Sequence, residues 1–494
     1  MFKRLRTYIL NFLSDSKQIP WLVGLSAGIY PFFKYYNSNF PLVDSKSHFV
    51  VLVLLFLLLP IFGSYFIKII GAKLHVIKKH EALLFTLNNF VFFALFVIIS
   101  TWGIRKEYLL IGLVIATIFG FLLKKHLKKA IVFQLLMAFL VVPKLILVLY
   151  SHFLTKDNWK NLPDNIGNVK LIEKPNIYFI QPDGYVSKKT LENKVYQSSS
   201  DLYNWLENKD FHVYHDFRSN YSSTLVSNAS LFTMKHHYFG ETLLPAMEMP
   251  RARSILNGDN SVIDILHNNG YQSYFIVEDD YFQQNLTKNS YSYQNIDLKN
   301  IPFFSSGQNI KRDVFKDLEN VIKRDKNSVN PKFFFIQKLI PHHVHYKESK
   351  EIERNDYLNK LDNASIWVKK IINLITEKDP NAIIIVAADH GGWVGIENYK
   401  DFYSTNDEFL VNSLFSTLCS IKWNKIDNLK YDKALKTNVN IFRVLFSALS
   451  KNSAYLNYLE EDGSYQLRKE NKIGMSIYRL IDKNGLVVSE KLEK

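Results

Sequence analysis

Five long apolar segments fill the first third of this 494-residue chain and restrict its fold more than any other feature. A run of about 20 apolar residues is long enough to cross the hydrocarbon core of a bilayer as a helix. The first segment is the weakest, because Pro20 and Pro31 flank it and it is rich in tyrosine. We predict a membrane domain of five helices over residues 1–155. The segments lie near residues 19–36, 48–71, 82–102, 108–123 and 130–150.

Charge in the loops predicts the orientation of these helices. Basic residues gather at the N-terminus, between the second and third segments, and in the Lys124–Lys129 loop. The other two loops carry only Lys46 in one and Arg105 and Lys106 in the other. Cytoplasmic loops of membrane proteins carry an excess of lysine and arginine. With five spans, everything after residue 150 is therefore expected on the outer side of the membrane.

The basic balance of the chain belongs to its membrane part. Residues 1–155 carry 17 Lys and Arg against four Asp and Glu, whereas the remainder carries 44 against 42. A nucleic-acid-binding domain would have a basic face of its own, so nucleic acid is not an expected partner. The single cysteine, Cys419, allows no intrachain disulfide and excludes a thiolate zinc site.

The second part of the chain has the pattern of an α/β domain. Short apolar runs at 176–181, 272–277, 332–337 and 382–387 alternate with helical patterns such as 261–268 and 364–376. Strands that are apolar on both faces are typical of a parallel sheet covered by helices. We predict a linker at 156–172, the α/β domain at 173–463, and a C-terminal hairpin or peripheral subdomain at 464–494.

Polar side chains follow three of the predicted strands. Asp183 follows the first, the histidines 342, 343 and 345 follow the third, and Asp389 and His390 follow the fourth. Ligands of open α/β sheets bind beyond the carboxyl ends of the strands, where Asp and His can hold a metal. The glycines after His390 would let the backbone pass close to a ligand.

Each of these residues also has a plainer interpretation. Asp183 fits a turn or helix cap, and the Asp389–His390 pair fits a strand-to-loop turn. The histidines 342, 343 and 345 fit a solvated loop. His236 and His237 lie near a predicted helix end and are interpreted as structural. A hydroxyl-rich turn at 218–227 precedes an apolar segment, which predicts a loop followed by a helix N-terminus. A hydroxyl there is either a helix cap or a nucleophile beside a metal.

Several runs of residues together resemble a known family. PNIYFIQPDGY, SNYSSTLVSNASLFTM, PHH and AADHGG, with NVNIFRVLFSAL further on, resemble the sulfatase-like hydrolase and transferase family of the alkaline phosphatase superfamily over about 173–450. Five spans followed by this domain are similar to lipid A phosphoethanolamine transferases and lipoteichoic acid synthases. The resemblance implies a multi-span α-helical membrane domain followed by an α/β alkaline phosphatase/sulfatase-like domain. It also implies a bacterial inner (cytoplasmic) membrane, with the catalytic domain periplasmic or extracellular.

The resemblance assigns roles to the polar residues. It implies that Asp183, Asp389, His390 and the Thr224 oxygen bind one divalent metal, Zn or Mn, and that Thr224 is the nucleophile. His342 matches a substrate-contacting or second-metal position and is a candidate to protonate a leaving group. Asn220 is either a phosphate contact or a cap. The chain departs from these transferases in having Asp183 where they carry Glu, and in having no histidine after His390.

The activity expected from the resemblance is transfer of a phospholipid head group, of phosphoethanolamine or phosphoglycerol type, to a cell-envelope glycan or glycolipid such as lipopolysaccharide. The donor phospholipid would leave its phosphate group on Thr224 before the acceptor takes it. Two alternatives stay open. One is a membrane-bound phosphodiesterase, phosphatase or sulfatase-like hydrolase, and the other is a non-catalytic lipid-binding member. No C/S-x-P-x-R motif occurs, so hydrolysis of sulfate esters is not expected.

Overall fold

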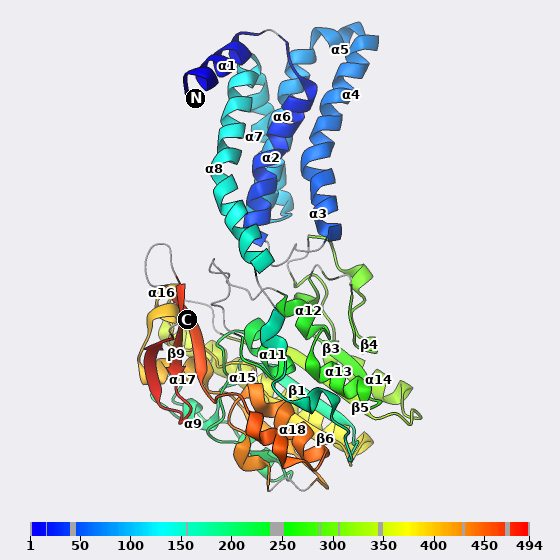
Figure 1. Cartoon of the computed structure of the whole chain (residues 1–494), viewed down its shortest axis with the longest axis vertical. Helices are drawn as coiled ribbons and strands as arrows, with labels where there is room; N and C mark the ends of the chain where they lie inside the picture. The colour runs from blue at the N-terminus through cyan, green and yellow to red at the C-terminus, as the bar shows by residue number, and fades with distance from the viewer. Residues whose placement is uncertain are drawn as a thin grey trace. The chain divides into compact units, whose positions relative to one another are not determined.

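The chain divides into two compact units, Met1–Leu154 and Thr155–Lys494 (Figure 1). His345 lies outside the described residues. The computed structural model describes residues 2–15, 17–39, 46–154, 157–237, 251–284, 286, 288–304, 307–343, 349–426, 430–469 and 475–492.

Helices form the first unit. Three described helical stretches are long and apolar enough to cross a membrane, which confirms a membrane protein. The first and fourth predicted segments are also helical, as α2 and α7, but α2 is less apolar and α7 has only 17 residues. Their crossing stays a prediction. The three stretches are Lys46–Lys73, Glu81–Trp102 and Lys124–Tyr150. The described helices are α1 (Phe2–Ser14), α2 (Pro20–Asn39), α3 (Lys46–Leu52), the π-helical η2 (Val53–Leu58), α4 (Leu59–Lys73), α5 (His75–Lys79), α6 (Glu81–Trp102), α7 (Lys106–Leu122), the 3₁₀ turn η3 (Lys124–His126) and α8 (Leu127–Leu154).

Helix α2 packs against α4, α6 and α8 within this unit. A Cβ at Gly28 would lie 1.6 Å from the Phe56 carbonyl oxygen, so only glycine lets α2 approach η2 this closely. The buried Asn89 amide donates to the Val23 carbonyl at 2.8 Å and exchanges hydrogen bonds with the Gln134 amide. Small residues and buried amides therefore join α2, α6 and α8, as is common where helices pack in a bilayer.

The second unit is built on a seven-stranded mixed sheet in the order β2-β7-β6-β1-β5-β3-β4. β1 is parallel to both β6 and β5, and β3 is parallel to β5 and β4. β7 runs antiparallel to β6, so the sheet is not purely parallel. All four strand predictions are found, as β1, β3, β5 and β6. The strands are β1 (Ile177–Asp183), β2 (His212–Val213), β3 (Gln272–Val277), β4 (Tyr293–Gln294), β5 (Lys332–Pro341), β6 (Ile383–Ala387) and β7 (Cys419–Lys422).

Apolar side chains on both faces of the sheet are buried under helices. Phe179 of β1 belongs to one core cluster, and its neighbours Tyr178 and Ile180 belong to the other. Helices α11, α13 and α18 contribute to the first cluster, and α10, α14 and α15 to the second. The helices are α9 (Lys188–Leu191), α10 (Leu202–Glu207), α11 (Thr224–Thr233), α12 (Ala252–Leu256), α13 (Ser261–Asn268), α14 (Val314–Arg324), α15 (Lys350–Lys378), α16 (Tyr399–Ser404), α17 (Glu408–Phe415) and α18 (Ile441–Leu449).

The segment predicted as a linker is part of the folded unit over 157–172. It forms two 3₁₀ turns, η4 (Asp157–Lys160) and η5 (Asn165–Asn168). Ile166, Val169 and Leu171 are buried in the first core cluster. The segment is mostly polar, which suggested a linker, but its few apolar residues pack against the sheet domain and anchor the segment there.

The C-terminal part forms a three-stranded antiparallel sheet rather than a hairpin. Its strands are β8 (Ser464–Lys469), β9 (Met475–Ile481) and β10 (Val487–Lys491), in the order β10-β9-β8. It is not peripheral, because Tyr465 is buried in the first core cluster and its backbone N–H donates to the Asn220 carbonyl at 2.8 Å. This small sheet supports the loop before α11.

Candidate metal centre

Three neighbouring strands deliver the predicted metal ligands to one place. Asp183 is the last residue of β1, which lies between β6 and β5 in the sheet. Asp389 and His390 follow β6, and His342 follows β5. Because these strands are parallel, their carboxyl ends meet at one edge, which is where an α/β sheet places its ligand site. The structure therefore brings Asp183, Asp389 and His390 together.

The three side chains form a compact, buried cluster. His390 Nε2 lies 3.2 Å from Asp183 Oδ1 and 3.6 Å from Asp389 Oδ2. One ligand atom from each residue can be chosen so that all lie within 4.8 Å of one another. Asp183 and His390 are fully buried, and Asp389 is 1% exposed. Two carboxylates and an imidazole so close together form a cation-binding donor set.

The two buried carboxylates of the cluster shift the pKa values of their neighbours. Burial raises the pKa of Asp183, but the neighbouring His342 and His390 outweigh it and hold the pKa well below its usual range. Burial, together with the Asp183 charge, raises the pKa of Asp389 to about 6, despite the opposing effect of His390. For His390, burial lowers the pKa, but the Asp389 and Asp183 charges prevail and raise it to about 9. The two carboxylates therefore favour a positive charge between them.

Two details show that a metal ion fits this place. The Nδ1 atom of His390 donates a hydrogen bond to the Gly391 carbonyl at 2.8 Å, which leaves Nε2 as the atom facing the carboxylates. Asp389 Oδ2 is buried and makes no hydrogen bond within the described part of the chain. A buried carboxylate oxygen without a hydrogen-bond donor calls for a cation nearby. The residues present therefore fit a divalent ion.

Thr224 lies beside this cluster. Its Oγ1 atom is 3.0 Å from His390 Nε2 and donates a 3.5 Å hydrogen bond to Asp183 Oδ1. Thr224 is the first residue of α11, and Ser223 before it makes no side-chain cap bond. The first backbone N–H groups of a helix favour a bound anion. The hydroxyl therefore lies between the metal ligands and a helix end suited to phosphate.

The loop before Thr224 is held by the C-terminal sheet and by the segment before α18. Asn220 is 1% exposed, and its Nδ2 donates to the Gly463 carbonyl at 2.8 Å. Its Oδ1 accepts from the Val439 N–H at 2.8 Å. The Ser464 hydroxyl donates to the Ser219 carbonyl at 2.6 Å. Both ends of the Asn220 amide are used inside the wall, which favours a supporting role over the predicted phosphate contact.

The histidines after β5 lie at the same edge of the sheet. His342 has a left-handed backbone, with φ of +64°, and its N–H donates to the Asp183 carbonyl at 2.8 Å. Its Nδ1 pairs with Asp183 Oδ2, and its side chain remains 28% exposed. His343 stacks on Trp393 with ring centroids 4.0 Å apart. His342 therefore contacts a metal ligand directly and still has a ring edge open to a substrate, whereas His343 lines the flank.

His236 and His237 lie away from the cluster, as the structural interpretation expected. Both are buried after the end of α11. His236 Nε2 donates to the Glu461 carbonyl at 2.7 Å, while the His237 ring packs against Trp159. These contacts tie the α11 end to the surrounding chain.

The glycines after His390 serve packing inside the protein. A Cβ at Gly391 would lie 2.1 Å from the Ser413 carbonyl oxygen, and one at Gly392 would lie 2.4 Å from the Tyr357 ring. The sequence predicted that the backbone after His390 passes close to a ligand. The close neighbours of these glycines are instead other residues of the protein. Gly184, with φ of +71°, has the His342 carbonyl carbon 3.1 Å from its ideal Cβ position.

Sequence reasoning missed the residues that position the ligands. Ser227 of α11 donates its hydroxyl to the Asp389 carbonyl at 2.6 Å, and the Asn438 amide donates to the same carbonyl at 3.2 Å. Tyr357 of α15 donates its hydroxyl to the Gly184 carbonyl at 2.8 Å. No local pattern marks these residues, because each acts across more than 45 positions of the chain.

Comparisons with known proteins identify a family for the second unit. A family model described as Sulfatase matches residues 187–444. The comparison with curated proteins found no match. Among solved structures, one similar chain is the C-terminal periplasmic domain of EptC from Escherichia coli in complex with Zn, at 12% identity and a TM-score of 0.40, covering 66% of this chain and 98% of that one. Another is the integral membrane lipooligosaccharide phosphoethanolamine transferase A of Neisseria meningitidis, at 13% identity and a TM-score of 0.40, covering 76% and 88%. A third is the C-terminal periplasmic domain of phosphoethanolamine transferase EptC from Campylobacter jejuni, at 12% and 0.38, covering 59% and 95%.

The α/β domain thus carries a buried Asp-Asp-His cluster at the carboxyl ends of parallel strands, with a threonine hydroxyl beside it. The family model spans more than half of the residues. The chain belongs to the sulfatase family, here joined to a membrane unit.

Proposed function

We propose that this protein transfers a phospholipid head group, of phosphoethanolamine or phosphoglycerol type, to a cell-envelope glycan or glycolipid. The observation that carries the proposal is the position of Thr224 Oγ1, 3.0 Å from His390 Nε2 and at the first turn of α11. A nucleophile in that position faces positive charge on both sides. Catalysis of phosphoryl transfer rests on such positioning and on charge stabilisation.

The reaction needs two displacements at phosphorus. Thr224 Oγ1 attacks the donor phosphate, forms an O–P bond and gives up its proton, while the bond from phosphorus to the diacylglycerol oxygen breaks. The diacylglycerol oxygen takes a proton, for which the part-exposed His342 ring is the proposed donor. An acceptor hydroxyl then attacks the same phosphorus, the bond to Thr224 breaks, and the threonine hydroxyl is restored. One divalent ion, Zn or Mn, held by Asp183, Asp389 and His390, would supply Lewis-acid stabilisation of the phosphate charge.

The membrane unit suits this donor. A lipid head group is confined to the bilayer surface, so an enzyme anchored in the same bilayer meets it at high effective concentration. We extend the proposal to location, with the catalytic unit on the periplasmic or extracellular side of a bacterial inner membrane. The loop charges support this orientation.

The test uses the full-length protein in liposomes that contain phosphatidylethanolamine or phosphatidylglycerol with a labelled head group. Intact-mass spectrometry is expected to find a head-group phosphate on Thr224, and Thr224→Ala should abolish both the adduct and transfer. Thr376→Ala is the matched control, because Thr376 lies in α15 and its hydroxyl bonds only the Ile372 carbonyl. An adduct that persists in Thr224→Ala would refute the nucleophile. Free head group in place of a glycan product would identify a hydrolase.

A further inference from the structure

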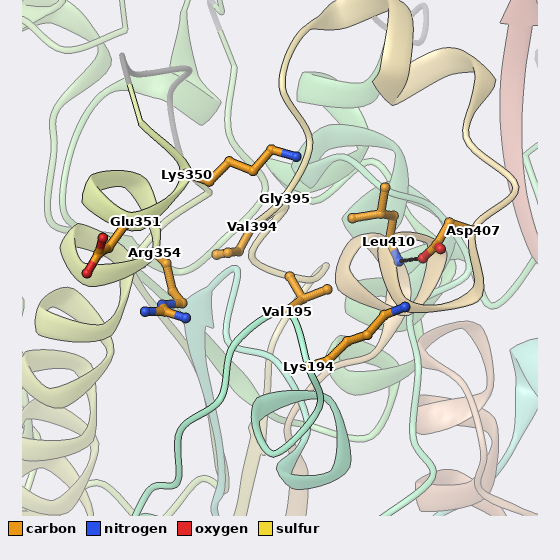
Figure 2. A pocket seen from close by; sticks show the side chains of 9 residues that line it. All are labelled: Lys194, Val195, Lys350, Glu351, Arg354, Val394, Gly395, Asp407 and Leu410. Carbon is orange, nitrogen blue, oxygen red and sulfur yellow. Dashed lines mark hydrogen bonds between the residues drawn. The ribbon is translucent and has the colours of Figure 1, made fainter.

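A cavity of about 620 Å³ opens at the start of α15, and the chemistry described so far does not use it. Figure 2 shows its lining, which includes Lys194, Lys350 and Arg354 with Val394 and Gly395 between them. Sites for small ligands are commonly on the order of 300–1,000 Å³ and combine apolar walls with a few polar groups. The cavity therefore has the size of a ligand site, and because five of its nine lining residues are charged, it suits a charged ligand.

Arg354 is the most informative residue of the lining. It is only partly exposed, and its Nε is buried without a hydrogen-bond partner. Its guanidinium forms no ion pair with any residue in the described parts of the chain. Buried polar groups are satisfied in most folded proteins, so an unsatisfied arginine beside a cavity needs an explanation. A guanidinium offers a planar fork of donors that matches the oxygens of a phosphate.

The lining carries three basic residues, Lys194, Lys350 and Arg354, against two acidic ones, Glu351 and Asp407. The Lys194 ammonium lies 4.1 Å from the centre of the Phe409 ring. It has no carboxylate partner among the described residues. Lys350 is the first residue of the 29-residue α15, whose N-terminus carries partial positive charge, although its ammonium pairs with Glu397 at 2.5 Å. Of the two acidic residues in the lining, Asp407 is engaged, since it accepts the Phe409 N–H at 2.9 Å as the cap of α17.

Single residues connect this cavity to the metal centre. The Trp393 ring lies 5.5 Å from the His390 ring, and Val394 and Gly395 of the cavity follow it directly. Arg354 lies one helical turn before Tyr357, whose hydroxyl bonds the Gly184 carbonyl next to Asp183. A molecule seated in the cavity is therefore adjacent to the residues that frame the reaction.

We infer that this cavity is an acceptor subsite that binds the phosphate group of a phosphorylated sugar, with Arg354 as its principal contact. The assignment of the bound molecule as the acceptor rests on the proposed function, but the binding of a phosphate group in the cavity does not depend on catalysis. The donor head group carries a phosphate as well, so the two sources share one chemistry. None of the residues that line the cavity belongs to the metal cluster, which suits the reacting phosphate, and this separation favours the acceptor.

The experiment measures binding of glucose 6-phosphate, glucose and glycerophosphoethanolamine to the full-length Thr224→Ala protein by isothermal titration calorimetry. Glucose 6-phosphate is expected to bind, and Arg354→Gln should weaken it by about ten- to a hundredfold, the range for hydrogen bonds to charged groups. Arg354→Lys should recover part of the loss. Lys360→Gln, which removes an exposed charge from the same helix, should leave binding unchanged.

Four outcomes would overturn the inference. The first two are glucose binding as tightly as glucose 6-phosphate, and Lys360→Gln weakening binding as much as Arg354→Gln does. Binding that EDTA abolishes and Arg354→Gln leaves intact would place the anion at the metal centre. Tighter binding of glycerophosphoethanolamine would assign the cavity to the donor. A protein that binds glucose 6-phosphate through Arg354 yet forms no Thr224 adduct in the liposome assay would refute the proposed function and leave the anion site standing.

Discussion

A buried ion pair holds the segment 157–172, which follows α8, to the rest of the second unit. Arg443 Nη1 of α18 lies 2.8 Å from Asp164 Oδ2, and the two side chains are 1% and 6% exposed. Removing one member of a buried pair leaves an uncompensated charge, which costs about 3–5 kcal/mol. Asp164→Ala should therefore lower the free energy of unfolding of this unit by that amount.

The corresponding shift in melting temperature follows from the size of the unit. For roughly 340 residues, the entropy of unfolding is about 0.7 kcal/mol per kelvin, so the expected loss is about 4–7 °C. The double variant Asp164→Ala/Arg443→Met should recover most of the loss, because neither charge remains buried. Thermal unfolding of the full-length protein in detergent, followed by tryptophan fluorescence, measures both.

A control pair separates burial from the mere presence of an ion pair. Lys369 and Asp201 lie 2.6 Å apart, but Asp201 is 80% exposed. Solvent and salt screen such a pair, so Asp201→Ala should shift the melting temperature little. The reasoning fails if Asp164→Ala behaves like Asp201→Ala, or if the double variant melts lower than either single variant.

Two further predictions concern the site and its support. Gly391→Ala would place a Cβ 2.1 Å from the Ser413 carbonyl oxygen, so it should destabilise the unit by about 1–3 kcal/mol and displace His390. A thermal melt and zinc titration measure this, with Gly167→Ala, whose nearest neighbour is 3.9 Å away, as the tolerated control. Burial lowers the pKa of His236 below 6.5, so the unfolded chain binds its proton more readily than the folded chain does. Its contribution to stability is present above pH 6.5 and lost as pH falls towards the folded pKa; His236→Gln should flatten that slope in denaturant unfolding, and an unchanged slope would contradict the assignment.

The cluster of Asp183, Asp389 and His390 was predictable because two simple regularities meet there. Buried parallel strands can be recognised in the sequence as apolar runs, and their carboxyl ends share an edge of the sheet. Asp183 and Asp389 are each within a few residues of such a run, so their approach follows from strand order alone. His390 comes with Asp389. These facts are local in sequence, apart from the pairing of β1 with β6.

The wall of the site was beyond local reasoning. Asn220 reaches Gly463, 243 positions away, and nothing near either residue marks the contact. The same holds for the apolar residues of the supposed linker, because Ile166 and Val169 are separated by polar residues and find their partners on α13 and the first core cluster. Long-range packing of this kind is set by the sheet as a whole.

Gly391 shows how a correct position can have a different physical reason. The sequence indicated only that no side chain is wanted after His390, and a ligand was one explanation. The structure supplies another, since the Ser413 carbonyl occupies the place of the missing Cβ and the Gly391 N–H donates to the Leu414 carbonyl at 2.9 Å. Gly391 is therefore held against α17, and Leu410 in the first turn of that helix also lines the cavity of Arg354. The same helix therefore lines the cavity through Leu410 and packs against the residue that follows His390.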